Sequence, residues 1–179
     1  MKKEILVVDG YNMIGAWSEL VNLKNRDLIE EARDRLLQIL SNYQSFENIE
    51  ILVVFDAQFV PGITKEYTKY KVKVVFTGQG ETADTYIEGV VDKLKNVLTD
   101  VTVATSDLAE QQLVFNKGAN RMSALDLMLE LQRSKRARDK EAEYQNTQGY
   151  GRKKRGSLTT DQLDELARLR EHLSGKSIK

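Results

Sequence analysis

Runs of β-branched and aliphatic residues recur along this chain, and acidic residues follow each of them. Four such runs lie at about residues 4–9, 50–55, 71–76 and 101–105, with helix-like segments between them. Apolar runs of this length that alternate with helices predict buried parallel strands. The sequence therefore predicts an α/β fold, a three-layer α/β/α domain with a mostly parallel central sheet and right-handed crossovers.

The acidic residues that follow the predicted strands are expected to meet at one edge of the sheet. Asp9 ends the first run and Asp56 the second, Glu81 and Asp84 follow the third, and Asp107 follows the fourth. Open α/β folds place their sites at this edge. Close carboxylates repel each other unless a cation joins them, and hard oxygen ligands suit Mg²⁺ or Mn²⁺. The sequence thus predicts a divalent metal site, in which a direct role for Asp56 stays open because it also fits a turn.

Each of these acids also has a simpler structural explanation. Asp9 and Asn12 could cap the next helix, although Asn12 could equally orient Asp9 or contact a phosphate. Glu81 and Asp84 would stand in the first turn of a helix, where its dipole stabilises acids. Asp107 could be an ordinary N-cap. The metal site is therefore a hypothesis that rests on the common position of these acids after strands.

The zero net charge of the chain conceals an acidic body and a basic segment. Residues 1–132 carry 14 Lys and Arg against 20 Asp and Glu, whereas residues 133–155 carry nine against three. This asymmetry suggests a polyanionic partner that the extension holds. We expect a catalytic domain at 1–132 and an extension at 133–179. The extension is predicted to hold a basic helix, a glycine-containing mobile loop at 145–157 and a last amphipathic helix at 160–173.

Nucleic-acid phosphate is the polyanion that the basic segment fits best. A second basic stretch at 64–73 mixes lysines with Tyr67 and Tyr70, which could stack on single-stranded bases. Both stretches also fit a plain solvated surface, and lysines protect edge strands. The candidate RNA-binding residues are Lys65, Lys69, Lys71, Arg133, Lys135, Arg136, Arg138, Arg152, Lys153, Lys154 and Arg155.

Composition excludes several other kinds of chemistry. The chain has no cysteine and one histidine, His172, which excludes thiolate sites, His-rich metal sites and a two-histidine cleavage of RNA. No apolar run approaches the roughly 20 residues of a membrane span, and no signal peptide precedes the first strand. No Gly-x-Gly-x-x-Gly motif follows that strand. We therefore expect a cytoplasmic protein with no membrane partner and no nucleotide cofactor.

Four motifs, in order, resemble those of the NYN domain, a branch of the PIN-like nuclease superfamily. They are Asp9-Gly10-Tyr11-Asn12, Phe55-Asp56-Ala57, Glu81-Thr82-Ala83-Asp84 and Thr105-Ser106-Asp107. The chain is most similar to bacterial YacP-like NYN proteins, and the resemblance covers nearly its whole length. It implies that Asp9 and Asp84 form the catalytic core, that Glu81 and Asp107 support them, and that Asn12 is the motif asparagine.

The resemblance implies a metal-dependent endoribonuclease, because some YacP-like proteins are ribosome-associated endoribonucleases that cleave mRNA during translation. The ribosome as a partner comes from the resemblance alone. The expected catalytic residues are Asp9, Asn12, Asp84 and Asp107, and the expected metal ligands are Asp9, Glu81, Asp84 and Asp107. The main alternative is a non-catalytic RNA- or ribosome-binding module. A phosphohydrolase for small phosphate esters is a third, less favoured interpretation.

Overall fold

The computed structural model describes residues 2–57, 70–78, 80–156, 160, 164–166, 168 and 170, with backbone alone for 146–156. The chain divides into two compact units, Met1–Arg136 and Ala137–Lys179. The first unit holds the sheet and all of the predicted acidic residues of the site. The helices of the described residues include none that is long and apolar enough to cross a bilayer.

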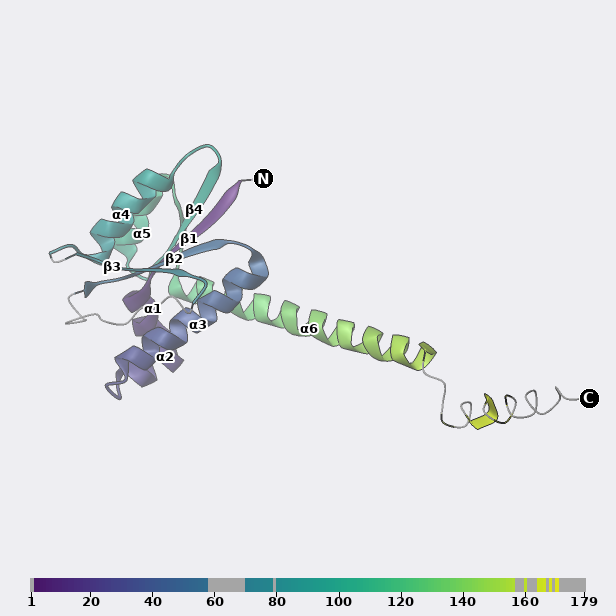
Figure 1. The fold of residues 1–179 in the computed structure, drawn as a ribbon. Coiled ribbons are helices and arrows are strands. Elements are labelled where there is room, and N and C mark those ends of the chain that lie inside the picture. The colour runs from purple at the N-terminus through teal and green to yellow at the C-terminus, as the bar shows by residue number, and fades with distance from the viewer. Residues whose placement is uncertain are drawn as a thin grey trace, which may run out of the picture. The chain divides into compact units, whose positions relative to one another are not determined.

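Five parallel strands form the sheet of the first unit. They are β1 (Lys3–Asp9), β2 (Glu50–Phe55), β3 (Lys73–Phe76), β4 (Thr99–Ala104) and β5 (Asn120–Met122). Their order across the sheet is β3-β2-β1-β4-β5 (Figure 1). In the central strand β1, Val8 lies beside Val53 of β2 and beside Ala104 of β4. The predicted α/β fold with a parallel sheet is confirmed.

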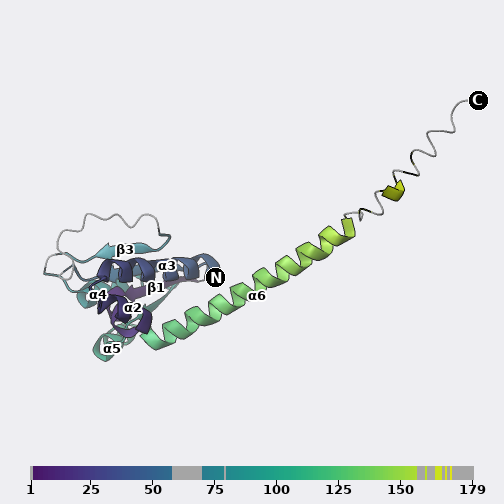
Figure 2. The same ribbon diagram turned by 90° about the horizontal axis from the view of Figure 1, so that it is seen from below.

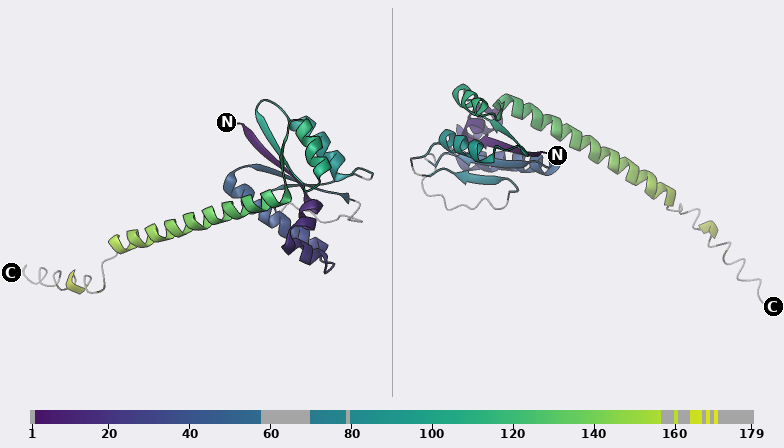
Figure 3. Two further views of the ribbon diagram at one scale, coloured as in Figure 1. Left: turned by 180° about the vertical axis from the view of Figure 1, so that it is seen from behind. Right: turned by 90° about the horizontal axis from the view of Figure 1, so that it is seen from above.

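Helices cover both faces of this sheet. They are α1 (Gly10–Ala16), α2 (Ser18–Lys24), α3 (Ile29–Glu47), α4 (Ala83–Leu94), α5 (Leu108–Asn116) and α6 (Ala124–Gly156). Leu6 and Val8 of β1 point into a core formed with α1, α2, α3 and the first turns of α6. Ile5 and Val7 point into the opposite core, against α4 and α5. Figure 1 shows α4 and α5 on one side of the sheet and α1 to α3 on the other, and Figures 2 and 3 show the same layers from below, behind and above.

A capping box starts the long C-terminal helix. Ser123 Oγ accepts a hydrogen bond from the Asp126 backbone N–H at 3.1 Å, and Asp126 Oδ2 accepts one from the Ser123 N–H at 3.3 Å. This reciprocal pair is a capping box with Asp in place of Glu. It fixes the point at which the chain turns from β5 into α6.

Helix α6 continues through most of the segment for which the sequence predicts a mobile loop. The backbone stays helical to Gly156, so the prediction of a loop at 145–157 differs from the structure. A glycine inside a helix costs only about 1 kcal/mol, and the Arg and Lys residues between Gly151 and Gly156 favour helix. The predicted last helix at 160–173 lies mostly outside the described residues, as does His172.

Candidate active site

Asp9 stands at the carboxyl end of the central strand, where the strand order reverses between β2 and β4. Open α/β sheets bind ligands at this switch point. Asp9 is also the N-cap of α1, and its Oδ1 accepts a hydrogen bond from the Asn12 N–H at 3.1 Å. The capping explanation therefore applies to this carboxylate, which is only 7% exposed, and its functional role stays a prediction.

The turn from β1 into α1 requires glycine at position 10. A Cβ atom there would lie 2.2 Å from Cε1 of Phe55, far inside contact distance. The Phe55 ring is fully buried, stacks on Phe76 at 5.4 Å between ring centroids, and meets the edge of Tyr11 at 5.1 Å. The aromatic packing beneath the turn thus holds the backbone that carries Asp9.

Asn12 connects two loops of the site. Its Oδ1 accepts a hydrogen bond from the backbone N–H of Ser106 at 2.8 Å. Because Asn12 lies in the first turn of α1 and Ser106 follows β4, this bond links the start of the helix after β1 to the loop after β4. The side-chain oxygen of Asn12 therefore positions the loop after β4.

The third acidic motif straddles the start of α4. Thr82 caps the helix, with its Oγ1 accepting from the Thr85 N–H at 3.2 Å. Asp84 lies in the first turn and is exposed. Glu81 precedes the cap, and its Oε2 accepts from the Gly78 N–H at 3.4 Å. Of the two acids, Asp84 is the one that reaches the centre of the site.

Asp107 is occupied as the N-cap of α5. Its Oδ1 accepts from the Ala109 N–H at 2.7 Å and from the Glu110 N–H at 3.4 Å. Its own N–H donates to Thr105 Oγ1 at 3.1 Å. The carboxylate is exposed, so the structure shows it as the residue that starts the helix beside the site.

Three carboxylates converge at this edge of the sheet. Asp9, Asp84 and Glu110 each contribute one oxygen, and these oxygens lie within 4.8 Å of one another. Glu110 is 3% exposed, and neither of its oxygens has a hydrogen-bond partner among the residues that the structure describes. An unpaired buried carboxylate is costly, and two acidic neighbours increase that cost.

The electrostatics of the cluster follow from this burial. Burial raises the pKa of Glu110 to about 8, and the charges of Asp9, Asp84 and Asp107 add to the rise. The Thr105 side chain opposes the shift, although its hydroxyl makes no hydrogen bond of good geometry to Glu110. Burial also raises the pKa of Asp9 to about 6, although the Asn12 N–H lowers it.

A divalent cation fits this donor set. Burial raises the pKa of Asp84 as well, and the charges of Asp107 and Asp56 add to the rise, as expected where several carboxylates are brought together. Carboxylate oxygens are hard ligands of the kind that Mg²⁺ and Mn²⁺ take. A bound cation would remove the repulsion and satisfy the unpaired oxygens of Glu110.

The structure brings some of the predicted residues together and adds one that the sequence reasoning missed. Asp9 and Asp84 lie in the cluster, and Glu81 and Asp107 stand beside it on the loops that lead to α4 and α5. Glu110 was missed. An acid three residues after an N-cap normally indicates a capping box, and this pattern does not predict that the side chain is buried in a site.

The predicted RNA-binding residues are only partly described. Lys71, Arg133, Lys135 and Arg136 are exposed, and Arg138 is half-buried. Lys65 and Lys69 lie outside the described residues. The backbone of the segment from Arg152 to Arg155 is helical, and its side chains are not described.

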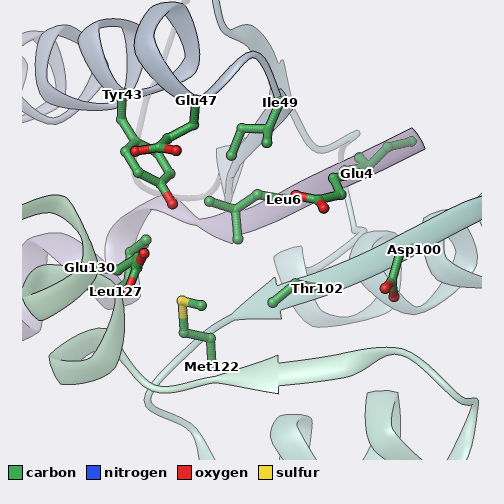
Figure 4. Close-up of a pocket in the computed structure, with 11 residues that line it drawn as sticks. Glu4, Leu6, Tyr43, Glu47, Ile49, Asp100, Thr102, Met122, Leu127 and Glu130 are labelled. Carbon is green, nitrogen blue, oxygen red and sulfur yellow. The ribbon is translucent and has the colours of Figure 1, made fainter. Parts of the chain in front are cut away.

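A second acidic surface lies away from this cluster. A hollow of about 240 Å³ is lined by Glu4, Glu47, Asp100 and Glu130, together with Tyr43 (Figure 4). Burial and the charges of Glu130, Glu47 and Glu4 raise the pKa of the Tyr43 hydroxyl to about 12. Glu4 and Asp100 stand near the amino ends of β1 and β4, so the hollow is not part of the candidate site.

Comparison with known proteins gives a family model, a sequence relative and two crystal structures that match this chain. The sequence model of the YacP-like NYN domain matches residues 6–171. YacP of Bacillus subtilis (strain 168), named as an uncharacterised protein, is 48% identical over 129 residues, which cover 72% of this chain and 75% of YacP. The crystal structure of Rae1 (YacP) from Bacillus subtilis matches with a TM-score of 0.72 and 38% identity, covering 98% of this chain and 99% of that chain. The crystal structure of a point mutant of Rae1 (YacP) matches with a TM-score of 0.71 and 41% identity, covering 80% of this chain and 84% of that chain.

Proposed function

Because the chain belongs to the YacP-like NYN domain family of PIN-like nucleases, we propose that it is a metal-dependent endoribonuclease. Its substrate in this proposal is mRNA, cleaved in the cytoplasm in association with the translating ribosome. The observation that carries the proposal is the cluster of Asp9, Asp84 and Glu110, whose oxygens lie within 4.8 Å of one another at the switch point of the sheet. Such a cluster is what phosphodiester hydrolysis with a divalent cation requires.

In this proposal Asp9 and Asp84 hold Mg²⁺ or Mn²⁺, directly or through water, and Glu81 and Asp107 support them. The cation would supply a Lewis acid that lowers the pKa of a bound water and neutralises charge on the scissile phosphate. Asn12 keeps the loop after β4 in place through Ser106. The expected products carry a 5′-phosphate and a 3′-hydroxyl. Ends with a 2′,3′-cyclic phosphate would contradict this chemistry.

RNA binding is assigned to the basic residues of the extension at 133–179, and catalysis to the domain at 1–132. Residues 133–155 carry nine Lys and Arg against three Asp and Glu, whereas the catalytic domain is acidic. Each lost phosphate contact should weaken binding and reduce the slope of log K against log salt by about 1. Lys135→Ala should show this change, and Lys24→Ala, at an exposed lysine of α2, should not.

The test is cleavage of an mRNA in a purified translation system that contains Mg²⁺ or Mn²⁺. Wild type is compared with Asp9→Asn, which keeps an N-cap for α1 because Asn caps as well as Asp. Glu31→Gln makes a similar change from carboxylate to amide on the exposed first turn of α3 and is the control. Discrete cuts that Asp9→Asn abolishes and Glu31→Gln retains would support the nuclease.

The same reaction without ribosomes tests the proposed partner. Cuts that need ribosomes would make the basic extension a docking element. Cuts on naked RNA of equal rate would contradict the ribosome requirement. Binding of RNA without cleavage in either setting would favour the non-catalytic binding module.

A further inference from the structure

We propose that Glu110, and not Asp107, is the third carboxylate ligand of the cation site, and that Asp107 is a positioning residue for it. The inference rests on the proposed metal site and assigns roles to two acids that stand three residues apart. It differs from the expectation that the resemblance gave, in which Asp107 of the Thr105-Ser106-Asp107 motif is a supporting acid and a metal ligand.

The position of Glu110 is that of a ligand. One of its oxygens lies within 4.8 Å of oxygens of both Asp9 and Asp84. Its side chain is 3% exposed, and both oxygens lack hydrogen-bond partners among the described residues. A buried polar side chain without a partner normally has an explanation, and an ion is among those expected. The two acids beside it make a cation the group that would satisfy it.

The position of Asp107 is that of a helix cap. Its Oδ1 already accepts from the N–H groups of Ala109 and Glu110, at 2.7 and 3.4 Å. The side chain is exposed, and Asp107 is not in the group of close oxygens found among the described residues. What Asp107 adds to the cluster is its charge, which raises the pKa values of Asp84 and Glu110.

The first turn of α5 holds Glu110 in this position. Asp107 caps the turn, its N–H donates to Thr105 Oγ1 at 3.1 Å, and Gln111 Nε2 donates to the Thr105 carbonyl oxygen at 2.8 Å. Gln111 is itself buried. These bonds fix where α5 begins, and the start of the helix determines that its third residue faces the cluster. A substitution that removes the cap should therefore displace Glu110. A substitution that keeps the cap and removes its charge should leave Glu110 in place.

The experiment measures Mn²⁺ binding to the full-length protein by the loss of the free-ion signal in electron paramagnetic resonance. Glu110→Gln removes the charge of the proposed ligand. Asp107→Asn removes the other charge and keeps the cap, because Asn is as good an N-cap as Asp. Asp107→Ala removes both charge and cap. Glu31→Gln on α3 is again the matched control.

Glu110→Gln should weaken Mn²⁺ affinity by about tenfold or more, since loss of even an outer-shell partner costs about 10- to 100-fold. Asp107→Asn should stay within about threefold of wild type, and Asp107→Ala should fall between the two. In the absence of metal, Glu110→Gln should melt at or above the wild-type temperature, because glutamine replaces a buried acid whose ionisation burial and its acidic neighbours disfavour. Circular dichroism therefore checks that the loss of binding is not a loss of folding.

Three results would overturn the inference. Wild-type affinity in Glu110→Gln would remove Glu110 from the site, and a loss in Asp107→Asn as large as that in Glu110→Gln would restore Asp107 as a ligand. Absence of Mn²⁺ binding by the wild type would overturn the metal site together with this inference. Loss of binding in Glu110→Gln beside a wild type that cuts no RNA would support the inference and reject the nuclease.

Discussion

Substitution of Gly10 by alanine tests how tightly the turn that carries Asp9 is packed. The new Cβ would lie 2.2, 2.5 and 2.7 Å from three carbons of the Phe55 ring. Ordinary contact begins near 3.4 Å, so the ring or the backbone must move by about 1 Å. The ring is fully buried and lies against Phe76 and Tyr11, which leaves it little room.

Overpacking of this kind costs typically about 1–3 kcal/mol. For a chain of this size, about 1 kcal/mol shifts the melting temperature by roughly 2–4 °C, so Gly10→Ala should melt roughly 2–12 °C lower. Gly15 lies on the same helix, and a Cβ there would meet nothing within 4 Å. Gly15→Ala should raise stability by roughly 0.5–1 kcal/mol, because alanine restricts the unfolded chain more than glycine does.

The assay is thermal unfolding followed by circular dichroism, with the double variant Gly10→Ala and Phe55→Leu as a rescue. The smaller side chain should make room for the Cβ, so the double variant should be more stable than the sum of the two single effects predicts. Equal shifts of the melting temperature, of the same sign, in Gly10→Ala and Gly15→Ala would refute the packing argument. Cleavage should also fall in Gly10→Ala, because the displaced backbone carries Asp9.

Three further outcomes follow from other contacts. In metal-free protein, the free energy of unfolding should fall as pH rises from about 4.5 to about 8, because folded Glu110 keeps a proton that the unfolded chain has lost. The melting temperature should fall with it, and Glu110→Gln should make this fall smaller. Asn12→Ala removes the acceptor of the Ser106 N–H and should cost about 1 kcal/mol in urea unfolding while lowering cleavage. Trp17→Phe leaves the Ala124 carbonyl without its 2.8 Å indole partner and should cost about 1–3 kcal/mol by circular dichroism; a change below about 0.5 kcal/mol would contradict this estimate.

Four of the five strands, and the edge of the sheet that they share, could be predicted from the sequence because each of these strands shows a local pattern. Strand β5 is only three residues long and was not predicted. The β-branched runs specify buried strands, and a parallel sheet brings their carboxyl ends together. The placement of Asp9 and Asp84 follows from this topology alone. Helices α1 and α2 were not predicted, since seven residues are too few for a helical period to show.

Glu110 could not be predicted for a different reason. Its spacing from Asp107 fits a capping box, and a local pattern gives no sign that the side chain is instead buried. Only the packing of α5 against the sheet determines that its third residue faces Asp9 and Asp84. The end of α6 was predicted wrongly because three glycines were taken to indicate a loop, although the residues beside them favour helix.

The central place of β1 has a consequence for the order in which the protein matures. β1 is synthesised first, yet one of its two neighbours, β4, is synthesised only after two other strands and four helices. Pairing of segments so distant in the chain is slow, because the entropy of closing a long loop is lost before the stabilising contacts form. The three acids of the cluster therefore meet only after α5 has left the ribosome that makes it. A nascent chain that stops before Glu110 contains Asp9 and Asp84 but no complete cluster, so under the proposed function it should not cut RNA near its own site of synthesis.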